Sequence, residues 1–179
     1  MTDSNSAKHE TASASASGVR AALDSRLEPN SLKWSEFRSQ QRVDVPAANI
    51  ELVLKTCRSA GMDQLVDLTV VDLLEYPGAS DRFQIVYLLL NTESGERLTV
   101  RTYLNEPDLT IPSAVPIWFG ADWLEREAYD MYGIVFSGHP NFKRLLLPAE
   151  FESFPLRKDY PVKGRGERHN FPIITRAES

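Results

Sequence analysis

Cysteine is nearly missing from this chain of 179 residues, which contains only Cys57. A single thiol cannot form a disulfide within the chain, and this agrees with a reducing compartment. An iron–sulfur cluster usually needs four thiolates and a Cys-rich zinc site needs several, so this chain alone is expected to hold neither. Histidine is scarce as well, because His9, His139 and His169 are the only three and no two stand at a helical ligand spacing. We therefore expect no metal site.

Long apolar runs are also missing. The longest strictly apolar run covers residues 85–90, which is far short of the roughly 20 residues that a membrane helix needs. We expect that the chain does not cross a bilayer. Residues 1–17 are rich in Ser and Ala, and this composition predicts a disordered tail. They lack the apolar region of a secretory signal, so we do not expect them to be one.

Basic residues are in deficit, since 20 Lys and Arg stand against 25 Asp and Glu and give a net charge of −5. This balance argues against general nucleic-acid binding, which needs a basic surface. The deficit is uneven along the chain. Residues 1–142 carry a charge of −8, whereas residues 143–176 carry +4.

The hydrophobic pattern predicts an α+β fold. Apolar residues recur with helical spacing in residues 19–27 and 47–60, where Cys57 is expected to pack as a small apolar side chain. The period changes to two in residues 65–74, 82–91 and 96–104, and another strand is predicted at 37–45. We expect a small, mostly antiparallel sheet packed by helices within residues 18–138. Residues 139–179 are rich in proline and predict an extended C-terminal segment, which we call the strap.

A helix predicted over residues 117–132 has no fully polar face. We expect it to pack on the sheet through an apolar stripe of Ile117, Ala121, Leu124, Ala128 and Met131. Aromatic and charged residues occupy both flanks: Trp118, Glu125 and Tyr132 on one, and Trp123, Glu127 and Asp130 on the other. Ser113 is predicted as the N-cap, and Gly133 is predicted to end the helix.

These charges allow two interpretations. In an enzyme, Glu125 and Glu127 would be paired catalytic carboxylates with His139 as a general base. Residues two apart project in nearly opposite directions on a helix, however, so they cannot converge on one substrate. Because unpaired buried charges are costly, the pattern favours a network of ion pairs and hydrogen bonds that joins the helix to the strap or to another protein. The candidate members of this network are Trp123, Glu125, Arg126, Glu127, Asp130, Tyr132, His139, Lys143, Arg144, Arg157, Lys158 and Asp159.

Two segments carry a resemblance to a known family. The first is EREAYDMYGIVF at residues 125–136, continued by GHP at 138–140 and KRLL at 143–146, and the second is PLRKDYP at 155–161. In order and spacing they resemble the C subunit of the proton-pumping NADH:quinone oxidoreductase, respiratory complex I. The resemblance covers about residues 36–161. Phe151 and Ser153 depart from the Trp and Gly that the family often has there, and Leu88 stands where a His is common.

The resemblance implies a non-catalytic scaffold protein in the peripheral arm of that complex. It implies no catalytic residue, flavin or Fe–S cluster in this chain, whereas the complex is an enzyme that uses NADH, FMN, Fe–S clusters and quinone. The implied partners are the quinone-site subunit and the Fe–S subunits, at the cytoplasmic face of the cell membrane. The isolated chain is expected to be inactive, and an apolar group of Phe171, Ile173 and Ile174 is expected to anchor the strap.

Three other functions stay open at this point. The chain is compatible with an equivalent scaffold in a related membrane-bound hydrogenase or dehydrogenase complex. A stand-alone carboxylate-dependent hydrolase would use Glu125, Glu127 and His139. A nucleic-acid binder would use the basic residues within 143–168, and its affinity would fall steeply with salt.

Overall fold

The computed structural model of the chain describes residues 18–28 and 31–167. The predicted tail at 1–17 and the predicted anchor at Phe171, Ile173 and Ile174 lie outside the described residues. Residues 18–24 are helical. They are followed by β1 (Lys33–Phe37), β2 (Gln40–Asp44), η1 (Ala47–Asn49), α2 (Ile50–Ser59), β3 (Gln64–Asp72), β4 (Phe83–Leu90), β5 (Arg97–Leu104), β6 (Thr110–Pro112), α3 (Ala121–Tyr132) and β7 (Val135–Ser137).

Five strands form one mainly antiparallel sheet in the order β1-β2-β5-β4-β3. The pairs β1–β2, β4–β5 and β3–β4 are antiparallel, and only β2–β5 is parallel. The predicted α+β fold with a mostly antiparallel sheet is therefore confirmed. The three strands predicted from a period of two correspond to β3, β4 and β5, because their alternate side chains are buried.

The strand predicted at residues 37–45 corresponds to β2 (Gln40–Asp44), but the prediction begins three residues too early and misses β1. This segment belongs to a hairpin in which Phe37 pairs with Gln40, and the turn between them places Arg38 and Ser39 at φ 50° and 61°. Hairpin turns of this kind usually carry Gly, Asn or Asp, because other residues disfavour a positive φ. The turn thus lacks the residue types from which a hairpin is normally predicted.

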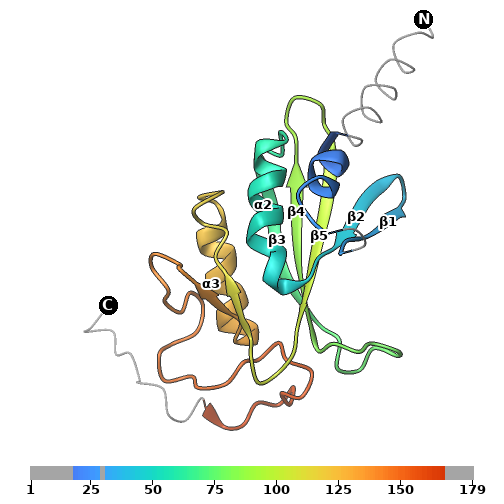
Figure 1. The fold of residues 1–179 in the computed structure, drawn as a ribbon. Coiled ribbons are helices and arrows are strands. Elements are labelled where there is room, and N and C mark those ends of the chain that lie inside the picture. Colours follow the sequence, from blue (N-terminus) through green and yellow to red (C-terminus); the bar gives the residue numbers. More distant parts are fainter. Residues whose placement is uncertain (1–17, 29–30, 168–179) are drawn as a thin grey trace, which may run out of the picture.

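The core lies between the sheet and the helices on one of its faces. Figure 1 shows α2 and the helical residues 18–24 on the same side of β3, β4 and β5. The buried α2 residues Val53, Leu54 and Cys57 join Leu23 and Ile85 in one apolar cluster. Cys57 is fully buried, and burial raises the pKa of its thiol to about 12, so it packs as the sequence predicted. None of the described helices has the length and apolar character that a membrane span requires.

Helix α3 lies beside β3 and is followed by the strap (Figure 1). It begins at Ala121 after Gly120, so the predicted N-cap Ser113 is wrong: residues 113–120 form turns, and the side chain of Ser113 instead contacts Glu125. Trp118 holds these turns to the α2–β3 connection, because its indole N–H donates to the carbonyl of Met62 at 3.2 Å. The described part of the strap, residues 139–167, contains no α-helix or β-strand.

Candidate functional site

The charged side chains of α3 meet the strap and the loop before the helix, and this junction is the candidate functional site. Asp130 lies at its centre and is fully buried. Its Oδ2 accepts the backbone N–H groups of Leu145, Leu146 and Leu147 at 3.0, 2.7 and 2.9 Å, and its Oδ1 lies 2.7 Å from Nη1 of Arg144. Burial alone would raise the pKa of Asp130, but these hydrogen bonds lower it below its ordinary value. An ionised carboxylate thus holds one turn of the strap against α3.

Glu125 faces away from the strap, towards the loop before α3. It is fully buried, and it accepts the hydroxyl of Ser113 at 2.7 Å and the N–H of Ala114 at 2.6 Å. Burial raises the pKa of Glu125 to about 7, and these two bonds oppose the shift. Among the described residues no Lys or Arg forms an ion pair with Glu125, so the expected cation partner is replaced by two neutral donors.

Arg126 connects α3 to the strap through backbone groups. Its Nε donates to the carbonyl of Lys143 at 3.0 Å, and its Nη2 donates to the carbonyl of Arg144 at 3.4 Å. The guanidinium also lies 5.3 Å from the ring centre of Trp123, which is 62% exposed. Lys143 therefore takes part through its main chain, while its own side chain is at the surface.

His139 fixes the beginning of the strap. Its buried imidazole accepts the N–H of Asn141 on Nδ1 at 3.0 Å, so in the neutral ring the proton lies on Nε2. Nε2 then donates to the carbonyl of Asp122 at 3.2 Å, and the Asp122 carboxylate lies 3.3 Å away. Nδ1 thus fixes the local turn of the strap, and Nε2 joins the strap to the first turn of α3.

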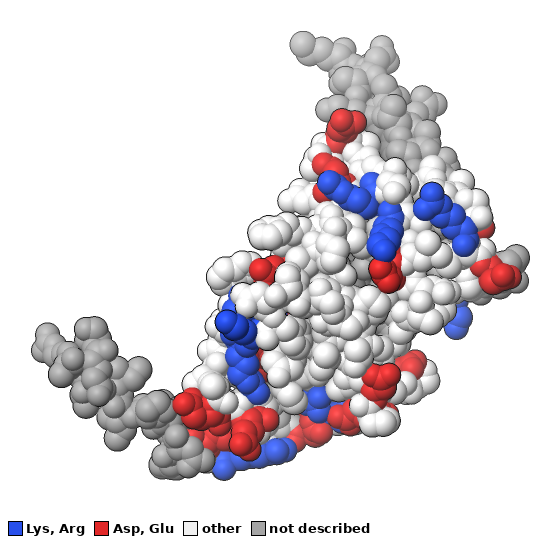
Figure 2. All heavy atoms as spheres, turned by 60° about the vertical axis from the view of Figure 1, so that its left-hand side comes forward, with Lys and Arg blue, Asp and Glu red and all other residues white. Residues whose placement is uncertain are grey.

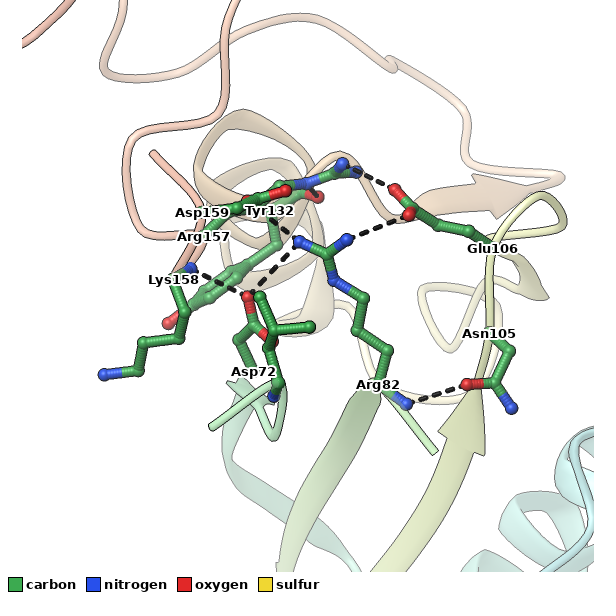
Figure 3. A network of polar contacts seen from close by, with 9 residues as sticks. Asp72, Arg82, Asn105, Glu106, Tyr132, Arg157, Lys158 and Asp159 are labelled. Carbon is green, nitrogen blue, oxygen red and sulfur yellow. Dashed lines mark hydrogen bonds and ion pairs between the residues drawn. The ribbon is translucent and has the colours of Figure 1, made fainter. Parts of the chain in front are cut away.

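A second group of charges lies at the C-terminal end of α3, around Arg82 (Figure 3). Arg82 begins the segment that leads into β4, and its side chain is 16% exposed. Its Nη1 lies 2.9 Å from Glu106, and its Nη2 lies 2.8 Å from Asp159 and 3.7 Å from Asp72. Arg82 thereby connects three segments that are distant in the sequence: the end of β3, the loop after β5 and the strap.

Arg157 and Lys158 complete this second group. Arg157 donates from Nε to the carbonyl of Tyr132 at 2.7 Å and pairs through Nη1 with Glu106 at 2.8 Å. Lys158 takes part through its backbone N–H, which donates to Asp72 at 2.8 Å. Figure 2 shows how closely acidic and basic side chains alternate along the lower rim of the molecule.

Gly133 allows the strap to pass close to the end of α3. It ends the helix at φ 80°, and a Cβ at this position would lie 2.7 Å from Phe154 and 2.8 Å from Arg157. Glycine is required here both by the backbone conformation and by the space that these two side chains occupy.

Of the twelve residues selected from the sequence, the structure places Asp130, Arg126, His139, Lys143 and Arg144 in one group. It places Tyr132, Arg157, Lys158 and Asp159 in the second group. Glu125 faces the loop before the helix, while Trp123 and Glu127 are exposed on α3. Glu125 and Glu127 therefore do not share a site, and no described group of three or more His, Cys, Asp or Glu is arranged to hold a metal.

The sequence did not reveal Arg82, Asp72 and Glu106 of the second group, and it did not reveal Ser113 as the partner of Glu125. One signal was present for Asp72. It follows Leu68 and Val70 at every second position of β3 and is buried with them, so an acid stood where the pattern required an apolar residue.

Comparisons with known proteins agree on one family. Residues 43–166 match the profile of the family described as the 30 Kd subunit of respiratory-chain NADH dehydrogenase. The C subunit of the NADH-quinone oxidoreductase of Brucella abortus (strain 2308) is 42% identical over 146 residues, which cover 82% of this chain and 70% of that protein. The corresponding protein of Brucella ovis gives the same identity and coverage.

Two solved structures are similar in fold. A trypsin-resistant fragment (1–134) of Nqo5 superimposes with a TM-score of 0.62 at 28% identity, over 73% of this chain and 98% of the fragment. A chain of the membrane-bound sulfane sulfur reductase, an archaeal respiratory membrane complex, gives a TM-score of 0.70 over 88% of this chain and 91% of that chain. Its identity of 22% supports a likeness of fold alone.

Proposed function

Because the chain belongs to the family of the 30 kDa subunit of respiratory-chain NADH dehydrogenase, we propose that it is a scaffold subunit in the peripheral arm of a proton-translocating NADH:quinone oxidoreductase. In this proposal the assembled complex passes electrons from NADH through FMN and Fe–S clusters to quinone. The chain binds the quinone-site subunit and the Fe–S subunits at the cytoplasmic face of the membrane, and it carries out no chemical step itself.

The observation that carries this proposal is the way in which α3 uses its charges. Asp130, Arg126 and His139 each use polar atoms to fix the strap, and the hydrogen bonds that they form do not converge on a common point where a substrate would bind. A catalytic group needs to face its substrate within hydrogen-bonding distance. Side chains that hold an extended segment in one shape suit a scaffold, which presents that segment to a neighbour.

The exposed apolar side chains of the same region support an interface. Phe119 and Trp123, four residues apart, are 82% and 62% exposed, and Leu146 and Leu156 on the strap are 62% and 50% exposed. Exposed aromatic residues among charged ones are typical of protein–protein contacts. Cys57 supports the proposal that this chain holds no Fe–S cluster. Its thiol is buried with a pKa of about 12, so it is a poor source of the thiolate that such a cluster needs.

The proposal is tested by purifying the tagged full-length chain from solubilised native membranes. We expect it to recover the cluster-bearing, quinone-site and membrane subunits, together with iron, FMN and NADH:quinone activity. Recovery of the chain alone, without iron and activity, would contradict the proposal.

Two matched variants sharpen this experiment. Asp130→Asn removes the charge that holds the strap and is expected to lower partner recovery by about tenfold or more. Glu127→Gln is the same chemical change at an exposed position of the same helix, and it should leave recovery unchanged. Equal recovery with both variants would show that the Asp130 anchor is not needed for assembly.

A second candidate is the equivalent scaffold in another respiratory membrane complex. The same fold occurs in a chain of the archaeal sulfane sulfur reductase complex, so the fold alone does not distinguish this candidate from the first. The contacts of the scaffold would be of the same kind, and only the electron donor and acceptor of the complex would differ. Oxidation of NADH by the purified complex, with FMN bound to a co-purified partner, favours the first candidate over this one.

A further inference from the structure

The main sheet carries helices on one face only in the described structure. Helix α2 and the helical residues 18–24 cover the face that buries Ile85 and Leu89 (Figure 1). Since side chains alternate along a strand, Val86, Leu88 and Leu90 of β4 lie on the opposite face, where all three are partly exposed. We call this opposite face the open sheet face. Antiparallel sheets with a solvated face normally carry polar side chains there, so a row of three aliphatic residues is unexpected.

Arginines border this aliphatic row. Arg97 pairs with Leu90 and Arg101 pairs with Val86 across the β4–β5 ladder, so each lies on the same face as its partner. Arg42 of β2 lies one strand further, opposite Thr99. The open sheet face therefore has an aliphatic centre on β4 and a basic border on β5 and β2.

The charge of this border is only partly balanced. Arg101 is paired with Asp44 at 2.6 Å, and Arg42 lies over the ring of Phe37 at 4.3 Å. Within the part of the chain that the structure describes, neither Arg42 nor Arg97 forms an ion pair with a carboxylate. In a protein of net charge −5, the β5 and β2 side of the row is thus a local positive surface, whereas Asp67 of β3, opposite Leu88, borders the other side.

From this arrangement we propose that the open sheet face is the docking site for an amphipathic helix of a neighbouring protein, with apolar residues over β4 and carboxylates beside Arg42 and Arg97. The neighbour is taken to be a protein of the same complex, so the inference rests on the proposed function. Residues 86–90 extend over roughly 13 Å, which corresponds to about nine residues of a helix. A helix is the natural cover, because a sheet buries an apolar face most simply under a layer of helices.

The shape of the surface favours a protein over a lipid bilayer as the partner of the open sheet face. A cavity of about 800 Å³ opens on this face next to the aliphatic row, with Val71, Arg101 and Tyr103 among its lining residues, while the row itself, Arg42 and Arg97 lie outside it. A hollow receives a protruding partner, whereas a surface that inserts into lipid headgroups protrudes itself. A second copy of this chain is disfavoured because it would bring Arg42 and Arg97 towards their own equivalents, and like charges in contact are unfavourable.

Thiol labelling tests whether the face is covered in the assembled complex. Cys57 is buried, so a single introduced thiol gives the only fast reaction of this chain, whose label is read after it has been separated from its partners. Thr69→Cys places a thiol on the open sheet face, since Thr69 is exposed and pairs with Val86. Ser59→Cys, exposed on α2, is the control. We expect the rate of maleimide labelling of Thr69→Cys to be about tenfold or more lower in the purified complex than in the isolated full-length chain. The labelling rate of Ser59→Cys should change little.

The result distinguishes the two proposals. If the complex is recovered and Thr69→Cys still reacts at the rate of the isolated chain, the open sheet face is uncovered and this inference fails while the proposed function stands. If the chain is recovered without partners, the proposed function fails and this inference fails with it.

Charge reversal and cross-linking test the chemistry of the partner. The double variant Arg42→Glu/Arg97→Glu is expected to lower partner recovery by about tenfold or more, whereas Lys55→Glu/Arg58→Glu on α2 makes the same charge change and should not. Circular dichroism checks that both variants fold. A photoreactive maleimide attached to Thr69→Cys should cross-link to a helix that carries Asp or Glu beside apolar residues. Equal recovery with both double variants overturns the inference, as does a lipid adduct or a cross-link to a second copy of this chain.

Discussion

The carboxylate of Asp130 and the guanidinium of Arg144 lie 2.7 Å apart, with Asp130 fully buried in α3 and Arg144 at the beginning of the strap turn that Asp130 holds. The same carboxylate accepts three consecutive backbone N–H groups from the strap. One side chain therefore fixes a turn of a segment that has no regular secondary structure. This explains how α3 can carry Asp130 in a buried position without the cost of unpaired charge.

Replacing Asp130 with Ala is expected to detach this turn. The change leaves Arg144 and three N–H groups without their acceptor, and we expect the free energy of unfolding to fall by about 2–4 kcal/mol. Urea unfolding of the full-length chain measures this loss. Glu127→Ala, at an exposed position of the same helix, is the control and should change stability by no more than about 0.5 kcal/mol. A similar effect of both variants would contradict the anchoring role of Asp130.

Gly133 and Gly138 provide a matched pair for testing the close approach of the strap. Both have φ 80°, but a Cβ on Gly133 would meet Phe154 and Arg157 at 2.7 and 2.8 Å, whereas a Cβ on Gly138 would have nothing within 4 Å. Gly138→Ala should cost about 1 kcal/mol, the backbone strain alone. Gly133→Ala should cost clearly more, because Phe154 and Arg157 must move. Thermal unfolding of the two variants measures the difference, and equal costs would show that the strap yields freely at this point.

The ion pairs of the two groups of charges should differ in coupling energy. Asp159 is paired with Arg82 but is 50% exposed, so solvent weakens that pair, whereas Asp130 is fully buried. In double-mutant cycles to Ala, we expect a coupling energy of about 0.5–1 kcal/mol for Arg82–Asp159 and a larger one for Arg144–Asp130. The first coupling should also decrease in high salt and the second much less. The reverse order would mean that exposure does not govern these pairs.

The helices and strands that bury one regular face could be predicted from the sequence. Helix α2 and strands β3–β5 follow from the spacing of apolar residues, since that spacing is set by local backbone geometry. The hairpin of β1 and β2 did not follow, because Arg38 and Ser39 adopt a conformation that their residue types disfavour. The parallel pairing of β2 with β5 is long-range, and no local pattern encodes it.

The charged side chains of the site could be selected from the sequence, but their partners could not. Asp130 and Arg126 stand out because they interrupt an apolar helix, yet both act mainly on backbone N–H and carbonyl groups, which have no sequence signature. Glu125 was expected to meet a cation and instead meets Ser113 and Ala114. A neutral environment of this kind depends on which loop the fold brings over the helix.

Glu125 makes stability depend on pH in a direction that is unusual for a carboxylate. Burial raises its pKa from 4.5 to about 7, so between these values the folded state binds a proton that the unfolded state has released. The contribution is fully present below about pH 4.5 and is lost as the pH rises through about 7. We expect the free energy of unfolding to fall by about 2–3 kcal/mol across this window. Asp130 and Asp159 do not oppose this trend, because their pKa values are lowered and they stay ionised throughout it.

Glu125→Gln isolates this effect, because an amide does not titrate. Histidines change charge in the same pH range, so the informative quantity is the difference between the variant and the unaltered chain, measured by urea unfolding at about pH 5 and about pH 8. The variant loses one hydrogen bond at both pH values, but its stability should fall less on going to the higher pH. Glu127→Gln, at the exposed position, should keep the full pH dependence. If Glu125→Gln keeps it as well, the Glu125 carboxylate is already ionised in the folded chain at neutral pH, and the two donors from Ser113 and Ala114 outweigh its burial.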